Sequence, residues 1–327
     1  MLVIGGTGII GRPLVEQALD SGYEVWAVAN SGKENIPSNA HYLEGDRRGK
    51  ERFGKILREA TKEVGNWDVL VDVNPYNERD ARALEGAIDG KANHIFILST
   101  TLVYDRVKIS FGHLVENDAL AQKGEQGGYV DGKIALEEFW QGTDLNWTIL
   151  RPYHILGEGS QLGCTPPHNR HPDLVQRIQD NEEIILPDGG RIPLMIVSPK
   201  DLARVILRAA GNSKTFRQAY NVLNPVEVLA RDYYKEIGRQ LGRDVKIKSV
   251  PAEDYWSKPI GWSLTTLPHL YSMAKLKEHL GWVPNISLDE CIRDALSIQM
   301  PVVPAQDLPV HKNMNKLPYP NRHEDYK

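Results

Sequence analysis

The stretch LVIGGTGIIG, residues 2–11, constrains the fold more than any other part of the chain. Three apolar residues typical of a buried strand run into Gly5, Gly8 and Gly11, and a helical pattern follows. Glycines at this spacing let the backbone turn tightly and let a pyrophosphate approach the N-terminus of the helix. The stretch therefore predicts a dinucleotide-binding strand, loop and helix. The alternative is a tight strand-to-helix turn that binds no ligand.

Short apolar runs and helical patterns alternate through the first half of the chain. The runs are rich in Val and Ile and mostly lack polar alternation, as in strands buried on both faces. They lie at residues 2–4, 24–29, 41–44, 68–73, 94–99 and 147–150, and helical patterns lie at 12–22 and 51–65. We therefore predict an α/β fold, with a doubly wound parallel sheet of the Rossmann type and a smaller C-terminal lobe that binds substrate.

The alternation changes after residue 155, which suggests how the chain is divided. Residues 193–215 look like a strand, a turn and a helix that return to the dinucleotide-binding domain formed by residues 1–155. Residues 156–192 and 216–300 are predicted to form the substrate lobe. Residues 301–327 are rich in proline and polar side chains, which indicates a tail or an extended strap.

Composition and charge exclude several classes of protein. Hydrophobic residues make up 41% and charged residues 25% of the chain, values of an ordinary globular protein. The net charge of −4 supplies no overall positive field for nucleic acid or an anionic membrane. Two cysteines cannot form a disulfide framework, and no apolar run reaches the roughly 20 residues that span a bilayer. The motif at the N-terminus leaves no room for a signal peptide, so we expect a cytoplasmic protein that acts on a small molecule.

The end of the second predicted strand bears on the choice of dinucleotide. An acidic side chain there normally binds the ribose 2′-hydroxyl, but this sequence has Asn30, followed by Ser31 and Lys33. No carboxylate repels a 2′-phosphate, and Ser31, Lys33 or Arg12 can bind one, so the sequence favours NADP over NAD without excluding NAD. Asp46, after the third strand, can reach the adenine edge or cap the next helix.

Residues 127–134, GGYVDGKI, admit two interpretations. Starting from Gly127, they nearly match the phosphate-loop motif of nucleotide hydrolases. That motif needs a preceding strand and a Ser or Thr after the lysine. No strand precedes them, and position 134 is isoleucine. Starting from Tyr129, they place a tyrosine and Lys133 one helical turn apart, so both can point into one pocket. An ammonium group beside a phenol lowers the phenol's pKa, which makes it usable as an acid or base. We adopt the second interpretation.

A hydroxyl at a strand end completes the predicted site. The stretch FILSTTLVY, residues 96–104, places Ser99, Thr100 and Thr101 at the carboxyl end of a buried strand, where open α/β sheets bind ligands. Such a hydroxyl can orient a substrate oxygen while Tyr129 transfers its proton. A Tyr-Lys pair alone is usually two surface residues, so the prediction depends on its combination with the glycine loop.

Together these motifs resemble a known family. GGTGIIG (5–11), STTLVY (99–104), YVDGK (129–133), LRP (150–152) and LGWVP (280–284) are similar to motifs of the extended short-chain dehydrogenase/reductase superfamily. Within it, the chain resembles the NAD-dependent epimerase/dehydratase family, along almost its whole length to about residue 300. NSGK and VDVNPY are similar to an atypical branch that includes the chloroplast stem-loop-binding proteins and their bacterial relatives.

The resemblance implies roles for individual residues. Tyr129 is implied as the catalytic acid/base, and Lys133 as the residue that binds the nicotinamide ribose and lowers the tyrosine pKa. Thr100 is implied as the hydroxyl that orients the substrate, with Ser99 and Thr101 as alternates. The candidate cofactor-binding residues are Gly5, Thr7, Gly8, Ile9, Ile10, Asn30, Ser31, Lys33, Asp46, Asn74, Ser99, Tyr129, Lys133, Pro152 and Tyr153. The candidate substrate-binding residues are Thr101, His154, His168 and Arg191.

The sequence also departs from the family. Thr101 and Leu102 replace the Asp-Glu pair of 4,6-dehydratases, which disfavours loss of water and leaves dehydrogenation, reduction, or epimerisation through a transient ketone. Pro193 and Leu194, after Arg191, make the nucleotide-sugar pocket less typical. The implied substrate is a sugar, a nucleotide sugar or a related hydroxy or keto metabolite. The alternative is a non-catalytic relative that binds RNA or senses a dinucleotide.

Three further features have weaker functional interpretations. Cys164, His168 and His171 have a spacing that metal ligands can have, but prolines interrupt the stretch and no second ligand pair follows, so we predict no metal site. His113 and Glu116 are either pocket residues or ordinary solvated loop residues. The helix KIALEEFW, residues 133–140, is expected to contribute to a homodimer interface, as this helix often does in the family, or simply to pack on the sheet.

Overall fold

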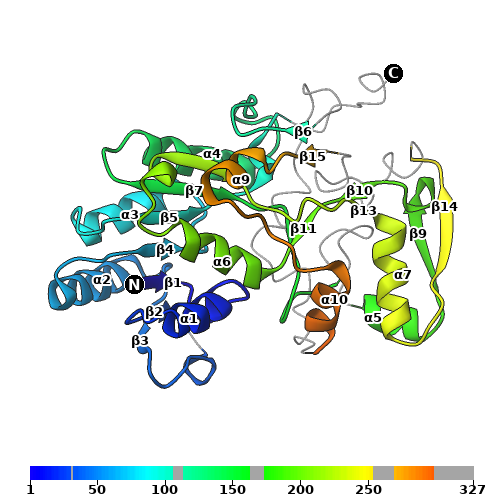
Figure 1. Cartoon of the computed structure of the whole chain (residues 1–327), viewed down its shortest axis with the longest axis horizontal. Helices are drawn as coiled ribbons and strands as arrows, with labels where there is room; N and C mark the ends of the chain where they lie inside the picture. Colours follow the sequence, from blue (N-terminus) through cyan, green and yellow to red (C-terminus); the bar gives the residue numbers. More distant parts are fainter. Residues whose placement is uncertain (31, 106–112, 163–172, 253–268, 298–327) are drawn as a thin grey trace.

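A seven-stranded parallel sheet forms the centre of the larger lobe (Figure 1). Its strand order is β3-β2-β1-β4-β5-β7-β12, and every neighbouring pair is parallel. The strands are β1 (Leu2–Ile4), β2 (Trp26–Ala29), β3 (His41–Glu44), β4 (Leu70–Asp72), β5 (Ile95–Leu98), β7 (Trp147–Arg151) and β12 (Gln218–Asn221). The predicted doubly wound α/β fold is therefore confirmed.

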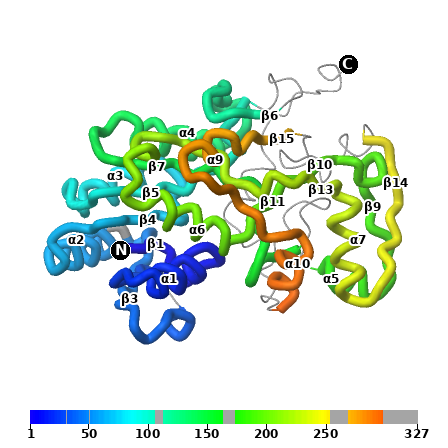
Figure 2. The backbone as a smooth tube through the Cα atoms, in the orientation of Figure 1, coloured from blue at the N-terminus to red at the C-terminus, as the bar shows by residue number. Residues whose placement is uncertain are grey.

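Helices cover both faces of this sheet, which explains its continuous apolar runs. One face carries α2 (Lys50–Val64), α3 (Glu78–Ile88) and α4 (Gly128–Gln141), and the other carries α1 (Gly11–Asp20), α6 (Pro199–Ala209) and α9 (Ala274–Leu280). Successive strand residues point to opposite faces, so Leu2 and Ile4 pack on the first side and Val3 on the second. The tube in Figure 2 shows this layering around the sheet.

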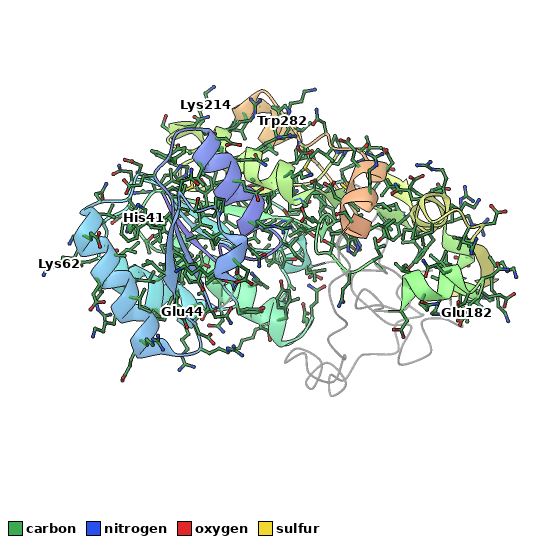
Figure 3. All side chains as sticks on the ribbon, turned by 90° about the horizontal axis from the view of Figure 1, so that it is seen from below. His41, Glu44, Lys62, Glu182, Lys214 and Trp282 are labelled. Atoms are coloured by element: carbon green, nitrogen blue, oxygen red, sulfur yellow. The ribbon has the colours of Figure 1, made fainter. Side chains whose placement is uncertain are left out.

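The smaller lobe has its own core. It consists of β9 (Glu183–Pro187) paired in parallel with β14 (Lys246–Val250), together with α5 (Leu174–Gln179), α7 (Ala230–Gln240) and α10 (Leu288–Ser297). Ile184, Tyr233, Ile237 and Ile292 are fully or almost fully buried within it. Figure 3 shows the length of the molecule, with Lys62 of α2 near one end and Glu182, beside β9, near the other.

Short strands and turns join the two lobes. The strand pairs are β8 (His154–Ile155) with β11 (Ile196–Val197), β10 (Pro193–Leu194) with β13 (Val228–Leu229), and β6 (His113–Leu114) with β15 (Leu270–Tyr271).

The 3-10 helices are η1 (Lys33–Asn35), η2 (Thr101–Val103), η3 (Asp188–Gly190) and η4 (Ser213–Thr215). The prediction ended the returning segment at residue 215, but β12 pairs with β7 in the central sheet, and Leu276 of α9 packs in the core on one face of that sheet. A local pattern cannot tell which sheet a strand joins.

The structure, a computed structural model, describes residues 1–30, 32–105, 113–162, 173–252 and 269–297. The predictions for Ser31, Cys164, His168, His171 and residues 301–327 lie outside these ranges. Within them, no helix is both long and apolar enough to cross a bilayer. The same ranges contain no group of three or more His, Cys, Asp or Glu side chains placed to hold a metal ion.

Candidate functional site

Two cavities lie at the carboxyl edge of the sheet, where β1 and β4 are neighbours. From β1 the chain passes to β2 on one side, while β4 leads to β5 on the other, so this is the switch point at which open α/β sheets bind ligands. One cavity, of about 290 Å³, lies over the glycine loop. The other, of about 240 Å³, lies over the ends of β4 and β5 and the start of α4. Val73 and Asn74 line both, so the two cavities adjoin, and together they are called the groove.

The larger cavity gathers most of the residues predicted to bind the adenosine and diphosphate part of a cofactor. Its lining includes Gly5, Thr7, Gly8, Ile9, Ile10, Asn30, Asp46 and Asn74. Lys33 is exposed in η1 and does not line this cavity. Hydrogen bonds from the Arg48 side chain and backbone, and one from Asn30, lower the pKa of Asp46.

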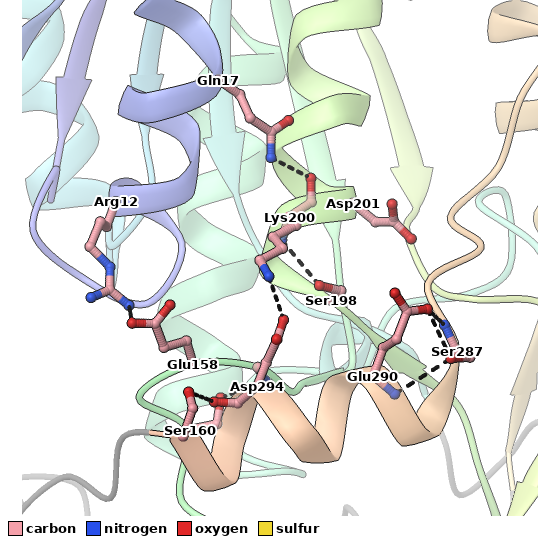
Figure 4. A network of polar contacts seen from close by, with 12 residues as sticks. Arg12, Gln17, Glu158, Ser160, Ser198, Lys200, Asp201, Ser287, Glu290 and Asp294 are labelled. Atoms are coloured by element: carbon pink, nitrogen blue, oxygen red, sulfur yellow. Dashed lines mark hydrogen bonds and ion pairs between the residues drawn. The ribbon is translucent and has the colours of Figure 1, made fainter. Parts of the chain in front are cut away.

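Arg12, a candidate ligand for a 2′-phosphate, is engaged elsewhere. Its Nη2 lies 2.8 Å from Oε1 of Glu158, so the ion pair joins the start of α1 to the loop after β8. Figure 4 shows this pair beside a second bridge, in which Lys200 of α6 contacts Asp294 of α10 at 2.6 Å. Both contacts connect the dinucleotide-binding core to segments of the smaller lobe.

Three of the four glycines at residues 5–11, namely Gly5, Gly8 and Gly11, differ in what an added side chain would meet. Gly5 has φ of +88°, and a Cβ there would lie 2.6 Å from Cγ2 of Val73 at the switch point. A Cβ on Gly11 would lie 2.0 Å from the Gly5 carbonyl oxygen, so the start of α1 packs directly on the loop. A Cβ on Gly8 would meet nothing closer than the Gly5 oxygen at 3.4 Å, although Gly8 lines the cavity. The fold has room for a Cβ at Gly8, so the lack of a side chain there fits a cavity that takes a ligand close to the backbone of the loop. The groove therefore fits a dinucleotide phosphate at the helix N-terminus.

This difference yields a matched pair of predictions. Gly8→Ala should change the unfolding temperature by less than about 2 °C but weaken NADH binding by at least about tenfold, because its methyl group enters the phosphate cradle. Gly11→Ala should lower the free energy of unfolding by about 1–3 kcal/mol through overpacking. Thermal melts and fluorescence titrations with NADH check both. Equal stability loss in the two variants would contradict the separate roles.

The smaller cavity brings together the predicted reacting groups. It is lined by Val73, Asn74, Pro75, Tyr76, Leu98, Ser99, Thr100, Tyr129, Lys133, Pro152, Tyr153 and Ile155. Tyr129 and Lys133 lie one turn apart on α4, and Nζ of Lys133 is 5.8 Å from the centroid of the Tyr129 ring. Nζ donates hydrogen bonds to the carbonyl oxygens of Pro75 (2.6 Å) and Leu98 (2.8 Å). An ammonium group has three N–H donors, so one is left for a ligand hydroxyl.

The position of Lys133 depends on the glycine before it. A Cβ on Gly132 would lie 2.6 Å from the carbonyl oxygen of Tyr76, so only glycine lets α4 approach this backbone so closely. The backbone itself is held by Asn77, which caps α3 by accepting hydrogen bonds from the N–H groups of Arg79 and Asp80. The glycine before Lys133 thus has a steric cause in this chain.

The charge of Lys133 is balanced between burial and neighbouring carboxylates. Burial lowers the pKa of Lys133 to about 8, although the negative charges of Asp72 and Glu137 act to raise it. Asp72, the last residue of β4, accepts a 2.6 Å ion-pair hydrogen bond from Arg47. Lys133 is therefore mostly protonated at neutral pH and loses its proton within about a unit or two above it.

Sequence reasoning missed a buried network behind the site. Oε1 of Glu137 accepts a 2.5 Å hydrogen bond from the Ser99 hydroxyl, and its Oε2 lies 2.6 Å from Nη2 of Arg151. Glu137 follows Lys133 by one helical turn, so its spacing could have indicated that it lies on the same face of the helix. Arg151 is the arginine of LRP, and no spacing in the sequence indicated that it pairs with Glu137. This network connects α4 to the ends of β5 and β7 beneath Lys133.

The network also distinguishes the candidate hydroxyls. The Ser99 hydroxyl donates a hydrogen bond to Oε1 of Glu137, and Thr101 is fully buried and does not line the cavity. Thr100 lines the cavity, and its Oγ1 accepts a hydrogen bond from the N–H of Leu102 (3.3 Å), which leaves its O–H free to act as a donor. The arrangement therefore favours Thr100 over the two alternates.

Several predicted residues lie away from the two cavities. His154 is buried in β8, and Arg191 is exposed after η3; neither lines the smaller cavity. Nε2 of the exposed His113 side chain lies 3.3 Å from Oε1 of Glu227, and Oε1 of Glu116 accepts a hydrogen bond from the N–H of Asn221. These positions depend on how the two lobes pack together, and a local sequence pattern does not indicate that packing.

Comparison with known proteins agrees with this geometry. The model of the NAD-dependent epimerase/dehydratase family matches residues 1–222. The chain is 24% identical over 318 residues to the chloroplast stem-loop binding protein of 41 kDa b of Arabidopsis thaliana, covering 91% of this chain and 78% of that protein.

Solved structures share the fold. The UDP-glucose 4-epimerase of Thermotoga maritima has a TM-score of 0.70 at 18% identity, over 90% of this chain and 97% of that one. The UDP-glucuronic acid 4-epimerase of Bacillus cereus, solved with UDP-glucuronic acid and NAD, has a TM-score of 0.69 at 15% identity, over 91% and 98% of the two chains. With the family match over most of the chain, the glycine loop and the Tyr-Lys helix, this chain belongs to the NAD-dependent epimerase/dehydratase family.

Proposed function

We propose that the protein is an NAD(P)-dependent epimerase or dehydrogenase/reductase that acts at a carbinol or ketone of a sugar, a nucleotide sugar or a related small metabolite. The observation that carries the proposal is the single groove in which a glycine loop leads to a cavity with Tyr129, Lys133 and Thr100. The two solved epimerases with the same fold act on nucleotide sugars, as their names state, which supports a substrate of this class.

Each side chain has one task in the proposed reaction. The phenol oxygen of Tyr129 takes the proton of the substrate hydroxyl in oxidation and returns it in reduction. Lys133, locked by the carbonyls of Pro75 and Leu98, holds a positive charge beside this phenol and favours its anionic form. Thr100 donates a hydrogen bond that orients the substrate oxygen. The dinucleotide, when bound, supplies the hydride acceptor and donor for the substrate carbon.

The choice between NAD and NADP is part of the proposal. No carboxylate stands at residue 30, where a 2′-phosphate would meet one in strictly NAD-dependent proteins, so we propose that NADP is accepted. Arg12 and Lys33 do not supply the expected positive charge at this end of the groove, because Arg12 pairs with Glu158 and Lys33 does not line the cavity. Homodimer formation through α4 and a cytoplasmic location stay predictions.

The test is a cofactor and substrate screen with the whole purified chain. We expect fluorescence titration to detect binding of NADH or NADPH, and a panel of UDP-sugars and simple sugars to yield a product by NMR or a change in absorbance of the reduced cofactor. Conversion of a UDP-sugar without net change in the cofactor identifies an epimerase, and net change identifies a dehydrogenase or reductase. Failure to bind either dinucleotide would overturn the proposal.

A second candidate function rests on the similarity to the chloroplast stem-loop binding protein. In this case the chain binds RNA and the groove serves at most as a dinucleotide sensor. Gel-shift titration with a stem-loop RNA tests it, with and without NADH. Binding of RNA that NADH alters, together with no turnover of any substrate in the panel, would favour this candidate over the enzyme.

A further inference from the structure

Tyr76 is unusual in being an exposed aromatic residue that also lines the smaller cavity. Its side chain is 51% exposed, and Tyr129, on the same cavity, is 36% exposed. Among the exposed large hydrophobic residues of the described chain, these two tyrosines are the aromatic ones. An exposed ring alone needs no explanation, but two rings at one cavity mouth suggest a surface that a ligand covers.

The backbone that carries this ring is firmly held. The N–H of Tyr76 donates a 2.7 Å hydrogen bond to Oδ2 of Asp80. The preceding carbonyl, of Pro75, accepts the 2.6 Å hydrogen bond of Lys133, and the carbonyl of Tyr76 lies against Gly132. These contacts fix the backbone from which the ring projects beside Lys133.

The position of the ring along the groove indicates what it contacts. Val73 and Asn74 line both cavities, whereas Tyr76, two residues further on, lines only the smaller one. Nζ of Lys133 lies 6.0 Å from the centroid of the Tyr76 ring and 5.8 Å from that of Tyr129. A dinucleotide that extends from the glycine loop towards Tyr129 must pass Asn74 and then Tyr76.

From this placement we propose that Tyr76 covers the nicotinamide-riboside half of the bound dinucleotide and slows its release. The inference rests on the proposed function and assigns cofactor retention to Tyr76, which was not among the candidate cofactor-binding residues predicted from the sequence. The ring contributes its face to the riboside, while the adenosine half depends on the glycine-loop cavity alone. The affinity for a ligand that fills only the glycine-loop cavity therefore does not depend on Tyr76.

Two ligands and two variants test this. A half-exposed tyrosine offers roughly 100 Å² of surface, and covering about half of it with a ligand is worth roughly tenfold in affinity. We expect Tyr76→Ala to raise the Kd for NADH about tenfold, mainly through faster dissociation, and to leave the Kd for ADP within about twofold. Tyr76→Phe keeps the ring and should bind NADH like the wild type. Fluorescence titration, stopped-flow dissociation and calorimetry with ADP give these values.

Other results of these binding measurements would contradict the proposed role of Tyr76 or the proposed function. Wild-type affinity for NADH in Tyr76→Ala would show that the ring does not cover the riboside. An equal loss of NADH and ADP affinity would show that the residue merely maintains the groove, and a Tyr76→Phe variant as weak as Tyr76→Ala would overturn the role of the ring face. If the wild type binds ADP but not NADH or NADPH, the proposed function itself fails.

Discussion

Replacing Tyr129 with phenylalanine is expected to lower kcat by about three orders of magnitude, the middle of the range for loss of a positioned acid or base. The variant keeps the ring that lies beside Lys133 and loses only the hydroxyl. Affinity for NADH should stay within about twofold, because phenylalanine keeps the ring that lines the smaller cavity. Turnover is measured with the substrate that the screen identifies, and NADH binding by fluorescence.

The control for this variant is Tyr23→Phe, which removes the same hydroxyl from a residue packed against the core outside both cavities. It should turn over like the wild type. A Tyr129→Phe variant with wild-type kcat would contradict the assigned acid/base. Loss of NADH binding together with activity would instead assign Tyr129 to cofactor binding.

Replacing Lys133 with methionine should lower kcat by about two orders of magnitude and yet not destabilise the protein at neutral pH. The reason is the cost of burying the ammonium. Burial lowers the pKa of Lys133 from 10.5 to about 8, a cost on the order of 3 kcal/mol, since each pKa unit is worth about 1.4 kcal/mol. The methionine avoids this cost but leaves the carbonyls of Pro75 and Leu98 without their donor, which offsets part of the gain.

The pH dependence of this effect follows from the sign of the shift. The folded pKa is below the unfolded one, so between about pH 8 and 10.5 the unfolded chain holds a proton that the folded chain has released. The free energy of unfolding of the wild type therefore gains a contribution from Lys133 as pH rises through this window. The advantage of Lys133→Met should be largest below pH 8 and shrink above it. Activity of the wild type should fall above about pH 8 if the ammonium is required.

Denaturant unfolding of both proteins across this pH range measures the difference. Lys275→Met is the matched control, because Nζ of Lys275 also donates to a backbone carbonyl, that of Ala219 (3.0 Å), but lies outside both cavities. It should retain wild-type turnover. A difference between Lys133→Met and the wild type that does not vary with pH would contradict a buried, charged Lys133.

Several features could be predicted from the sequence because they are local. Residues 2–11 contain a strand, a loop and the start of a helix, and their glycines indicate a tight backbone turn at the positions they occupy. Tyr129 and Lys133 share a helix face by spacing alone. The third strand was predicted at its observed bounds, His41–Glu44, since its apolar run is short and bounded by polar residues.

Other features depend on which elements lie side by side. Arg47 with Asp72, and Arg12 with Glu158, pair residues that are distant in sequence, so no short pattern reveals them. The sequence named Thr100 with Ser99 and Thr101 as alternates, and the arrangement favours Thr100 because Ser99 donates to Glu137 and Thr101 is buried away from the cavity.

By itself, then, the sequence determined the fold class, because apolar runs and helical patterns alternate along the chain. It also determined the dinucleotide loop and the Tyr-Lys helix, because each follows from backbone geometry within about a dozen residues. The tertiary structure alone decided that β12 joins the central sheet, that Gly132 sets the distance from α4 to Tyr76, and that Tyr76 lines the cavity. The physical reason is that the order of strands brings the ends of β4, β5 and β7 and the start of α4 together. The chemistry of the site lies in the contacts between them.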